Sequence, residues 1–127
     1  MSDFTLINLR DAEDMTASSP LADQVQFRRL RSELESEHLG LGHFALQPGF
    51  RVPFGHRHGE QEEVYVILAG GGRIKIEDEV LELRQWDAVR LPPETARAFE
   101  AGPDGLELLA IGFAEGGDAE TLKDFWD

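Results

Sequence analysis

Residues 49–70 read GFRVPFGHRHGEQEEVYVILAG and carry two histidines and a carboxylate at fixed spacing on strand-like sequence. His56 and His58 are two positions apart, so on an extended segment both imidazoles leave the same face. Glu63 opens the apolar run at 64–68, which predicts a buried strand, and its carboxylate can turn back toward the rings. Two imidazoles and one carboxylate suit iron, manganese, zinc or nickel and leave coordination positions for water or substrate.

The same spacing has a second interpretation, in which the two histidines are exposed or hydrogen-bonded side chains of a loop rich in glycine and arginine. A turn signal at Pro48-Gly49 precedes the pair and a core strand follows it. This context places the pair at the mouth of a core strand, where sites in β-barrels tend to lie, and favours a binding site.

These residues resemble the first motif of the cupin superfamily, which runs from a glycine through His-x-His and a glutamate to a second glycine. With one extra residue before the first histidine, the motif positions are filled by Gly49, His56, His58, Glu63 and Gly70. Glu63, and not Glu62, takes the ligand position because only Glu63 has six residues before Gly70. The resemblance implies an all-β fold, an antiparallel β-barrel or jelly roll.

The second cupin motif is matched only in part. Asp87 and Pro92 fit the pattern, whereas Trp86 and Glu94 stand in place of its two glycines. Arg97 occupies the position at which the family carries its fourth metal-ligating histidine. A guanidinium has no lone pair to offer a cation and repels a nearby divalent ion, so this replacement weakens the prediction of a metal.

Two arrangements of the site follow from Arg97. In one, His56, His58 and Glu63 hold a metal, and Arg97 turns aside or toward a bound anionic substrate. In the other, Arg97 pairs with Glu63 across the cavity and the site is metal-free. Burying Glu63 without any cation would cost several kcal/mol. Tyr65 shares the parity of Glu63 on its strand, so we expect it to line the ligand pocket together with Arg97.

Strand signals continue along the rest of the chain. Alternating apolar residues predict a hairpin over 71–85 and further strands at 88–91, 95–99 and 106–111, with turns at 92–93 and 102–105. Many short strands at regular spacing favour an antiparallel barrel or jelly roll, in agreement with the resemblance.

The length of 127 residues predicts one domain, spanning 1–127. Its barrel core is expected at about 41–112, with an N-terminal strand extension at 1–40 and a C-terminal tail or short helix at 113–127. Apolar strands at 4–9 and 25–30 need a partner surface, which predicts a homodimer in which such a strand is exchanged. Gly116-Gly117-Asp118 would cap the helix, in which Leu122, Phe125 and Trp126 would dock on the barrel.

Composition limits the partners. A formal net charge of -13 argues against nucleic acid and anionic membranes, which are bound through excess lysine and arginine. The single basic cluster, Arg28, Arg29 and Arg31, is expected at a solvent face or subunit contact. The absence of cysteine excludes disulfides and thiolate sites, and the first residues lack a basic and apolar leader, so the expected location is the cytoplasm.

The resemblance implies a small-molecule ligand but no single reaction, because cupins include dioxygenases, isomerases, sugar-binding modules and storage proteins. Two hypotheses stay open. The first is a metal-dependent enzyme of dioxygenase or isomerase type, which uses a divalent transition metal (Fe, Mn, Zn or Ni) on a small anionic metabolite. The second is a metal-free ligand-binding or sensor protein without catalytic activity.

Overall fold

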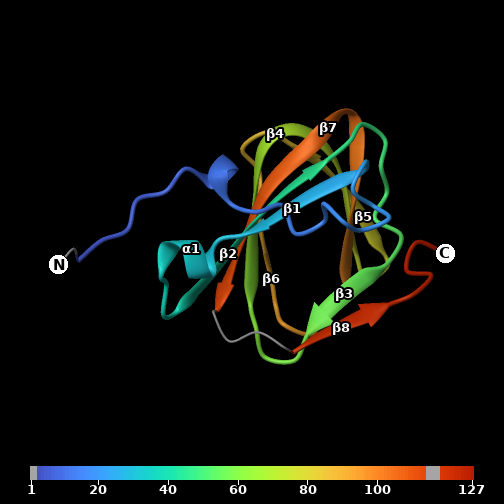
Figure 1. Cartoon of the computed structure of the whole chain (residues 1–127). Helices are drawn as coiled ribbons and strands as arrows, with labels where there is room; N and C mark the ends of the chain where they lie inside the picture. The colour runs from blue at the N-terminus through green and yellow to red at the C-terminus, as the bar shows by residue number, and fades with distance from the viewer. Residues whose placement is uncertain (1–2, 114–117) are drawn as a thin grey trace.

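The structure, a computed structural model, describes residues 3–113 and 118–127. In this part of the chain, eight strands form one antiparallel sheet that curls into a barrel (Figure 1). They are β1 (Val25–Arg29), β2 (Leu39–Leu46), β3 (Gly55–His58), β4 (Glu63–Ile76), β5 (Glu79–Arg84), β6 (Ala88–Leu91), β7 (Arg97–Phe113) and β8 (Ala119–Leu122). The short helices η1 (Leu9–Asp11) and α1 (Arg31–Leu34) flank β1 in the chain. The predicted all-β antiparallel fold is confirmed.

One end of the barrel interior is filled with large side chains. β2, β7 and β4 lie side by side, and their register sets Phe44 opposite Leu108 and Leu108 opposite Ile67. Because alternate residues of a strand face the same way, these positions point inward together. The buried core includes Leu46, Tyr65, Ile67, Ile74, Leu83, Leu91, Phe99, Leu106 and Leu108.

Toward the other end of the barrel, the inward-facing residues of β2 and β7 have very small side chains or none. Two residues further along, the inward positions of β2 and β7 are Gly42 opposite Ala110 and then Gly40 opposite Gly112. All four line a cavity of about 430 Å³. The barrel is therefore packed at one end and hollow at the other because of which residues its strands present.

The predicted strands at 95–99 and 106–111 are parts of one long strand, β7. The predicted turn at 102–105 is an irregularity in its pairing with β4, where Gly70 lies opposite Leu106 but Gly72 lies opposite Ala101. A Cβ on Gly70 would lie 2.1 Å from the carbonyl oxygen of Gly105, so this close backbone approach requires glycine.

The predicted C-terminal helix is wrong. Ala119–Leu122 form β8, which pairs with β3, and no helix occurs within residues 118–127. Phe125 and Trp126 nevertheless dock on the barrel as predicted: Trp126 Nε1 donates to the carbonyl of Val52 at 2.9 Å, and the Phe125 ring occupies the space beside Gly55. The open edge of β3 determines the strand, because its backbone groups need hydrogen-bond partners. The expected cap residues Gly116 and Gly117 lie outside the described residues.

The predicted strand at 4–9 is also wrong, whereas the predicted strand at 25–30 is confirmed as β1. Residues 4–8 have no regular structure, and the N-terminal segment projects away from the barrel (Figure 1). The side chains of Phe4 and Leu6 are largely exposed. Among the described residues, no helix has the length and hydropathy needed to cross a membrane.

Candidate metal centre

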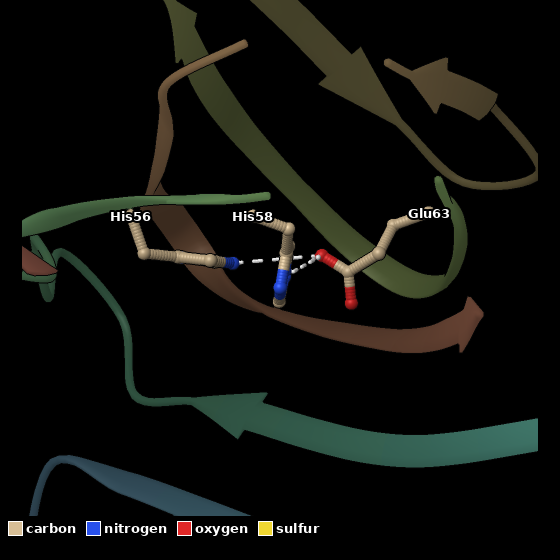
Figure 2. Close-up of side chains that lie close together, drawn as sticks. All are labelled: His56, His58 and Glu63. Atoms are coloured by element: carbon tan, nitrogen blue, oxygen red, sulfur yellow. Dashed lines mark hydrogen bonds and ion pairs between the residues drawn. The ribbon is translucent and has the colours of Figure 1, made fainter. Parts of the chain in front are cut away.

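The structure brings the three predicted ligands together at the hollow end of the barrel. His56 and His58 come from β3, and Glu63 is the first residue of β4. Both rings point at one carboxylate oxygen (Figure 2), with Glu63 Oε1 3.5 Å from His56 Nε2 and 3.0 Å from His58 Nε2. One ligand atom from each residue lies within 4.8 Å of the other two.

His58 is held between two carboxylates. Its Nδ1 lies 3.0 Å from Asp118 Oδ1, on the opposite side of the ring from Glu63. The other Asp118 oxygen accepts hydrogen bonds from the backbone nitrogens of Glu60 and Gln61. The bond from Glu60, together with that of His58, holds the pKa of Asp118 well below its usual range, so Asp118 is an anion. If His58 carries a proton on Nδ1, that proton satisfies Asp118 and Nε2 faces Glu63.

Sequence reasoning missed Asp118. Its distance of 60 residues from His58 gives no local signal, and only the pairing of β8 with β3 places it here. The signal that exists is its position directly before the strand Ala119–Leu122, which sequence reasoning took for a helix.

Arg97 and Tyr65 lie behind Glu63. Arg97 Nη2 is 3.0 Å from Glu63 Oε1, and the Tyr65 hydroxyl donates to the same oxygen at 2.5 Å. The rest of the guanidinium is also held, since Nε donates to Tyr65 and Nη1 donates to the carbonyls of Thr95 and Pro93. Arg97 is fully buried. Neither Arg97 nor Tyr65 is among the residues that line the cavity, so their predicted contact with a ligand stays a prediction.

Glu63 is ionised in this environment. Its burial raises its pKa, but hydrogen bonds from His56 and Tyr65 and the charges of His58 and Arg97 outweigh burial and bring the pKa to about 2. Burial raises the pKa of Tyr65, and the charge of Glu63 raises it further, so the hydroxyl keeps its proton and donates. The Glu63 carboxylate therefore carries a negative charge that the surrounding donors and cations stabilise.

The donor set and the charge of the centre fit a divalent transition metal. With neutral imidazoles, the two carboxylates of Glu63 and Asp118 exceed the single guanidinium of Arg97 by one negative charge. His56 and His58 direct one ring nitrogen each toward Glu63, and Asp118 supports His58 from outside, as carboxylates commonly support metal-bound histidines. The negative charge of Asp118 offsets the repulsion that Arg97 introduces.

The centre opens into the cavity of about 430 Å³. Besides the triad, its walls include Phe27, Arg29, Arg31, Phe44 and Phe113. Arg29 and Arg31 are exposed, as expected for a solvent face, and they also line the cavity. Arg28 points to the other face of β1, where its Nε donates to the carbonyl of Ala12 at 3.1 Å. The shared parity of Val25, Phe27 and Arg29 is the signal that identifies the inward residues.

Comparison with known proteins agrees with the fold. No known family profile matches the chain. An uncharacterized protein of Methanocaldococcus jannaschii is 36% identical over 59 residues, which are 46% of this chain and 47% of that protein, so the match spans about half of each.

Solved structures match over almost the whole chain. A cupin protein from Bacteroides fragilis is 26% identical, covers 92% of both chains and has a TM-score of 0.73. The polyketide cyclase RemF from Streptomyces resistomycificus is 20% identical, with a TM-score of 0.76 over 95% of this chain and 85% of the cyclase. A deletion mutant of Bacillus subtilis oxalate decarboxylase is 22% identical, with a TM-score of 0.74 over 98% of this chain and 32% of that protein. With the barrel, the His-x-His strand and these matches, the chain belongs to the cupin superfamily.

Proposed function

We propose that this protein is a metal-dependent cupin enzyme, in which His56, His58 and Glu63 bind a divalent transition metal beside a small-molecule pocket. The observation that carries the proposal is the convergence of two imidazole nitrogens on one carboxylate oxygen at the hollow end of the barrel. Among the similar structures, the cyclase and the decarboxylase are enzymes by name, which supports chemistry on a small molecule.

The position of His58 requires a cation between its ring and Glu63. When His58 donates its Nδ1 proton to Asp118, its Nε2 lone pair faces Glu63 Oε1 at 3.0 Å. Two lone pairs at this distance repel each other unless a cation lies between them. Either a metal ion or a second proton on His58 satisfies this requirement, and a metal is bound by neutral imidazoles and carboxylates.

The residues of the chain have separate roles in this proposal. A bound metal would act as a Lewis acid with positions left for substrate, consistent with dioxygenase or isomerase chemistry and with Fe, Mn, Zn or Ni. Asp118 keeps the His58 ring oriented, while Arg97 and Tyr65 hold the Glu63 carboxylate in place. The hollow end of the barrel admits the substrate to the faces of His56 and His58 that line the cavity.

Elemental analysis of the purified, untagged protein tests this proposal. We expect a stoichiometric transition metal in the wild type and its loss in His56→Ala and Glu63→Gln. Matched controls are His38→Ala, because His38 is exposed, and Glu62→Gln, because Glu62 faces outward and pairs with Arg90. Both controls should retain the metal; if Glu62→Gln loses it and Glu63→Gln keeps it, the assignment of ligands is wrong.

A second candidate function rests on the ion pair between Arg97 and Glu63. If His58 carries both protons, it donates to both carboxylates and the centre is electrically neutral without a metal. The protein would then be a metal-free ligand-binding or sensor cupin. Absence of metal after growth in medium supplemented with Fe, Mn, Zn and Ni would favour this function over the enzyme.

A further inference from the structure

The cavity has a cationic group on a different strand from those that carry the metal centre. Arg29 is the last residue of β1 and lines the cavity. Its guanidinium carbon lies 5.5 Å from the centre of the Phe27 ring. Within residues 3–113 and 118–127, no acidic side chain pairs with it, although the protein carries a net charge of -13. An unpaired arginine in the wall of a cavity is available to an anion from solution.

Beside Arg29 the cavity wall is aromatic. Phe27 and Phe44 lie opposite each other on β1 and β2, and their rings stack at 4.4 Å between centroids with an angle of 18° between planes. A Cβ on Gly42 would approach Phe27 to 3.0 Å, so the glycine gives the ring room to lie across β2. The stacked pair offers a flat apolar surface next to the cation.

The two charged regions of the cavity lie on different strands. In the sheet, Arg29 is opposite Gly42, Gly42 is opposite Ala110, and Ala110 is opposite Tyr65 on the strand that begins with Glu63. Three strand spacings separate β1 from β4, which is roughly 14 Å along the sheet and less across the cavity because the sheet is curled. A ligand can therefore place a negative end at Arg29 without bringing it against the carboxylate of Glu63.

We propose that the ligand of this cavity is a small carboxylate with a flat apolar body. Its carboxylate binds Arg29, its body packs on Phe27 and Phe44, and its opposite end reaches His56 and His58. The cavity of about 430 Å³ is at the small end of the range for ligand sites, which suits a ligand built on one ring. This inference rests on the proposed small-molecule function and specifies the class of ligand.

Three matched probes test the inference by titration calorimetry. Phenylacetate has both ring and carboxylate, phenylacetamide has the ring without the charge, and acetate has the charge without the ring. We expect phenylacetate to bind more tightly than the other two. Arg29→Gln should weaken phenylacetate binding about tenfold or more, because a charge-assisted contact is lost, and should leave phenylacetamide unaffected. Phe27→Leu should weaken both ring-bearing probes.

Arg28→Gln is the matched control, because Arg28 is on the same strand but faces away from the cavity and bonds Ala12 and Gln26. It should bind phenylacetate as the wild type does. Equal binding of phenylacetate and phenylacetamide, no binding of any probe, or unchanged binding in a folded Arg29→Gln variant would overturn the inference.

The metal content of the same samples separates this inference from the proposed enzyme. Arg29→Gln is expected to keep the metal content of the wild type while it loses affinity for phenylacetate. A wild type without metal that still binds phenylacetate through Arg29 would refute the metal-dependent function and leave the ligand class standing. A protein that contains the metal but binds phenylacetate no more tightly than phenylacetamide would support the metal-dependent function and refute the proposed ligand class.

Discussion

Arg97 occupies the position at which the resemblance to the second cupin motif predicts a metal-ligating histidine, and its side chain is part of a filled hydrogen-bond network. Its guanidinium is bonded to Glu63, Tyr65 and two backbone carbonyls and is fully buried. Replacing one partner of a buried ion pair typically costs about 3–5 kcal/mol. The arginine thus stabilises the carboxylate on which both histidines converge.

We predict that Arg97→His raises the affinity for Mn, Zn and Ni, because it removes a positive charge beside Glu63 and adds a nitrogen ligand. The same change should lower the free energy of unfolding, since Tyr65 and Glu63 lose their bonds to the guanidinium. Titration calorimetry and chemical denaturation measure the two effects. Arg90→His is the control, because Arg90 is exposed and pairs with Glu62. Equal metal affinity in Arg97→His and the wild type would show that position 97 does not act on the centre.

Asp118→Asn is predicted to lower metal affinity by about tenfold to a hundredfold, as is typical when a carboxylate behind a metal-bound histidine is lost. The amide cannot hold the His58 ring with a negative charge, so the ring loses its fixed orientation. Competition with a chelator measures the affinity. Glu120→Gln, which breaks only an exposed pair with Arg57, should leave it unchanged. An unchanged affinity in Asp118→Asn would exclude Asp118 from the centre.

At the scale of elements, the carboxylate of Asp14 helps to fix the connector before β1 to that strand. Asp14 Oδ1 accepts from Thr16 N at 3.0 Å, from Thr16 Oγ1 at 2.7 Å and from Phe27 N at 3.1 Å. Because Phe27 and Arg29 form part of the cavity wall, this turn supports the site as well as the fold.

We predict that Asp14→Ala lowers the free energy of unfolding by about 1–2 kcal/mol at neutral pH. The hydrogen bonds from Thr16 hold the pKa of Asp14 below its ordinary value, so its carboxylate stabilises the fold above the pKa of the unfolded chain. That stabilisation is lost as the pH falls through the folded pKa. The difference between variant and wild type in urea denaturation should therefore shrink from pH 7 to pH 3. A difference that grows at low pH would contradict this account.

Strands that are determined by a local side-chain pattern could be predicted from the sequence, whereas a strand that depends on distant residues could not. Alternation identifies β1, β6 and the hairpin of β4 and β5, because their side-chain pattern is local. The C-terminal segment was mispredicted because the pairing of Ala119–Leu122 with β3 depends on residues about 60 positions away. The triad was predicted by spacing, Arg97 was placed in the site by the resemblance to the second cupin motif, and parity correctly set Tyr65 beside Glu63. That Tyr65 and Arg97 contact Glu63 without lining the cavity depends on the curl of the sheet, and a local sequence pattern does not contain this information.

At the scale of the whole molecule, the N-terminal segment exposes apolar side chains that the barrel does not cover. Phe4 is 77% exposed and Leu6 is 87% exposed, and the segment extends away from the barrel (Figure 1). We propose that it packs against a second copy of this chain in a two-fold homodimer.

Size-exclusion chromatography with light scattering should return the mass of a dimer at micromolar concentration. The double variant Phe4→Ser with Leu6→Ser should shift the protein toward the monomer, because it removes the apolar contact without touching the barrel. Leu39→Ser, at another exposed apolar position, is the control and should remain dimeric. A monomer mass for the wild type across this concentration range would refute the dimer.

The hollow end of the barrel restricts how the ligand range of this protein can change in evolution. Gly40, Gly42 and Gly112 line the cavity and already contribute no side chain. A methyl group on Gly112 would come within 2.9 Å of Gln61, and one on Gly42 would press on Phe27. Any substitution at these three glycines adds a side chain and reduces the volume of the cavity. Single mutations there therefore restrict the protein to smaller ligands. Acceptance of bulkier ligands must instead begin at wall residues that carry large side chains, such as Phe27, Phe44 or Gln61.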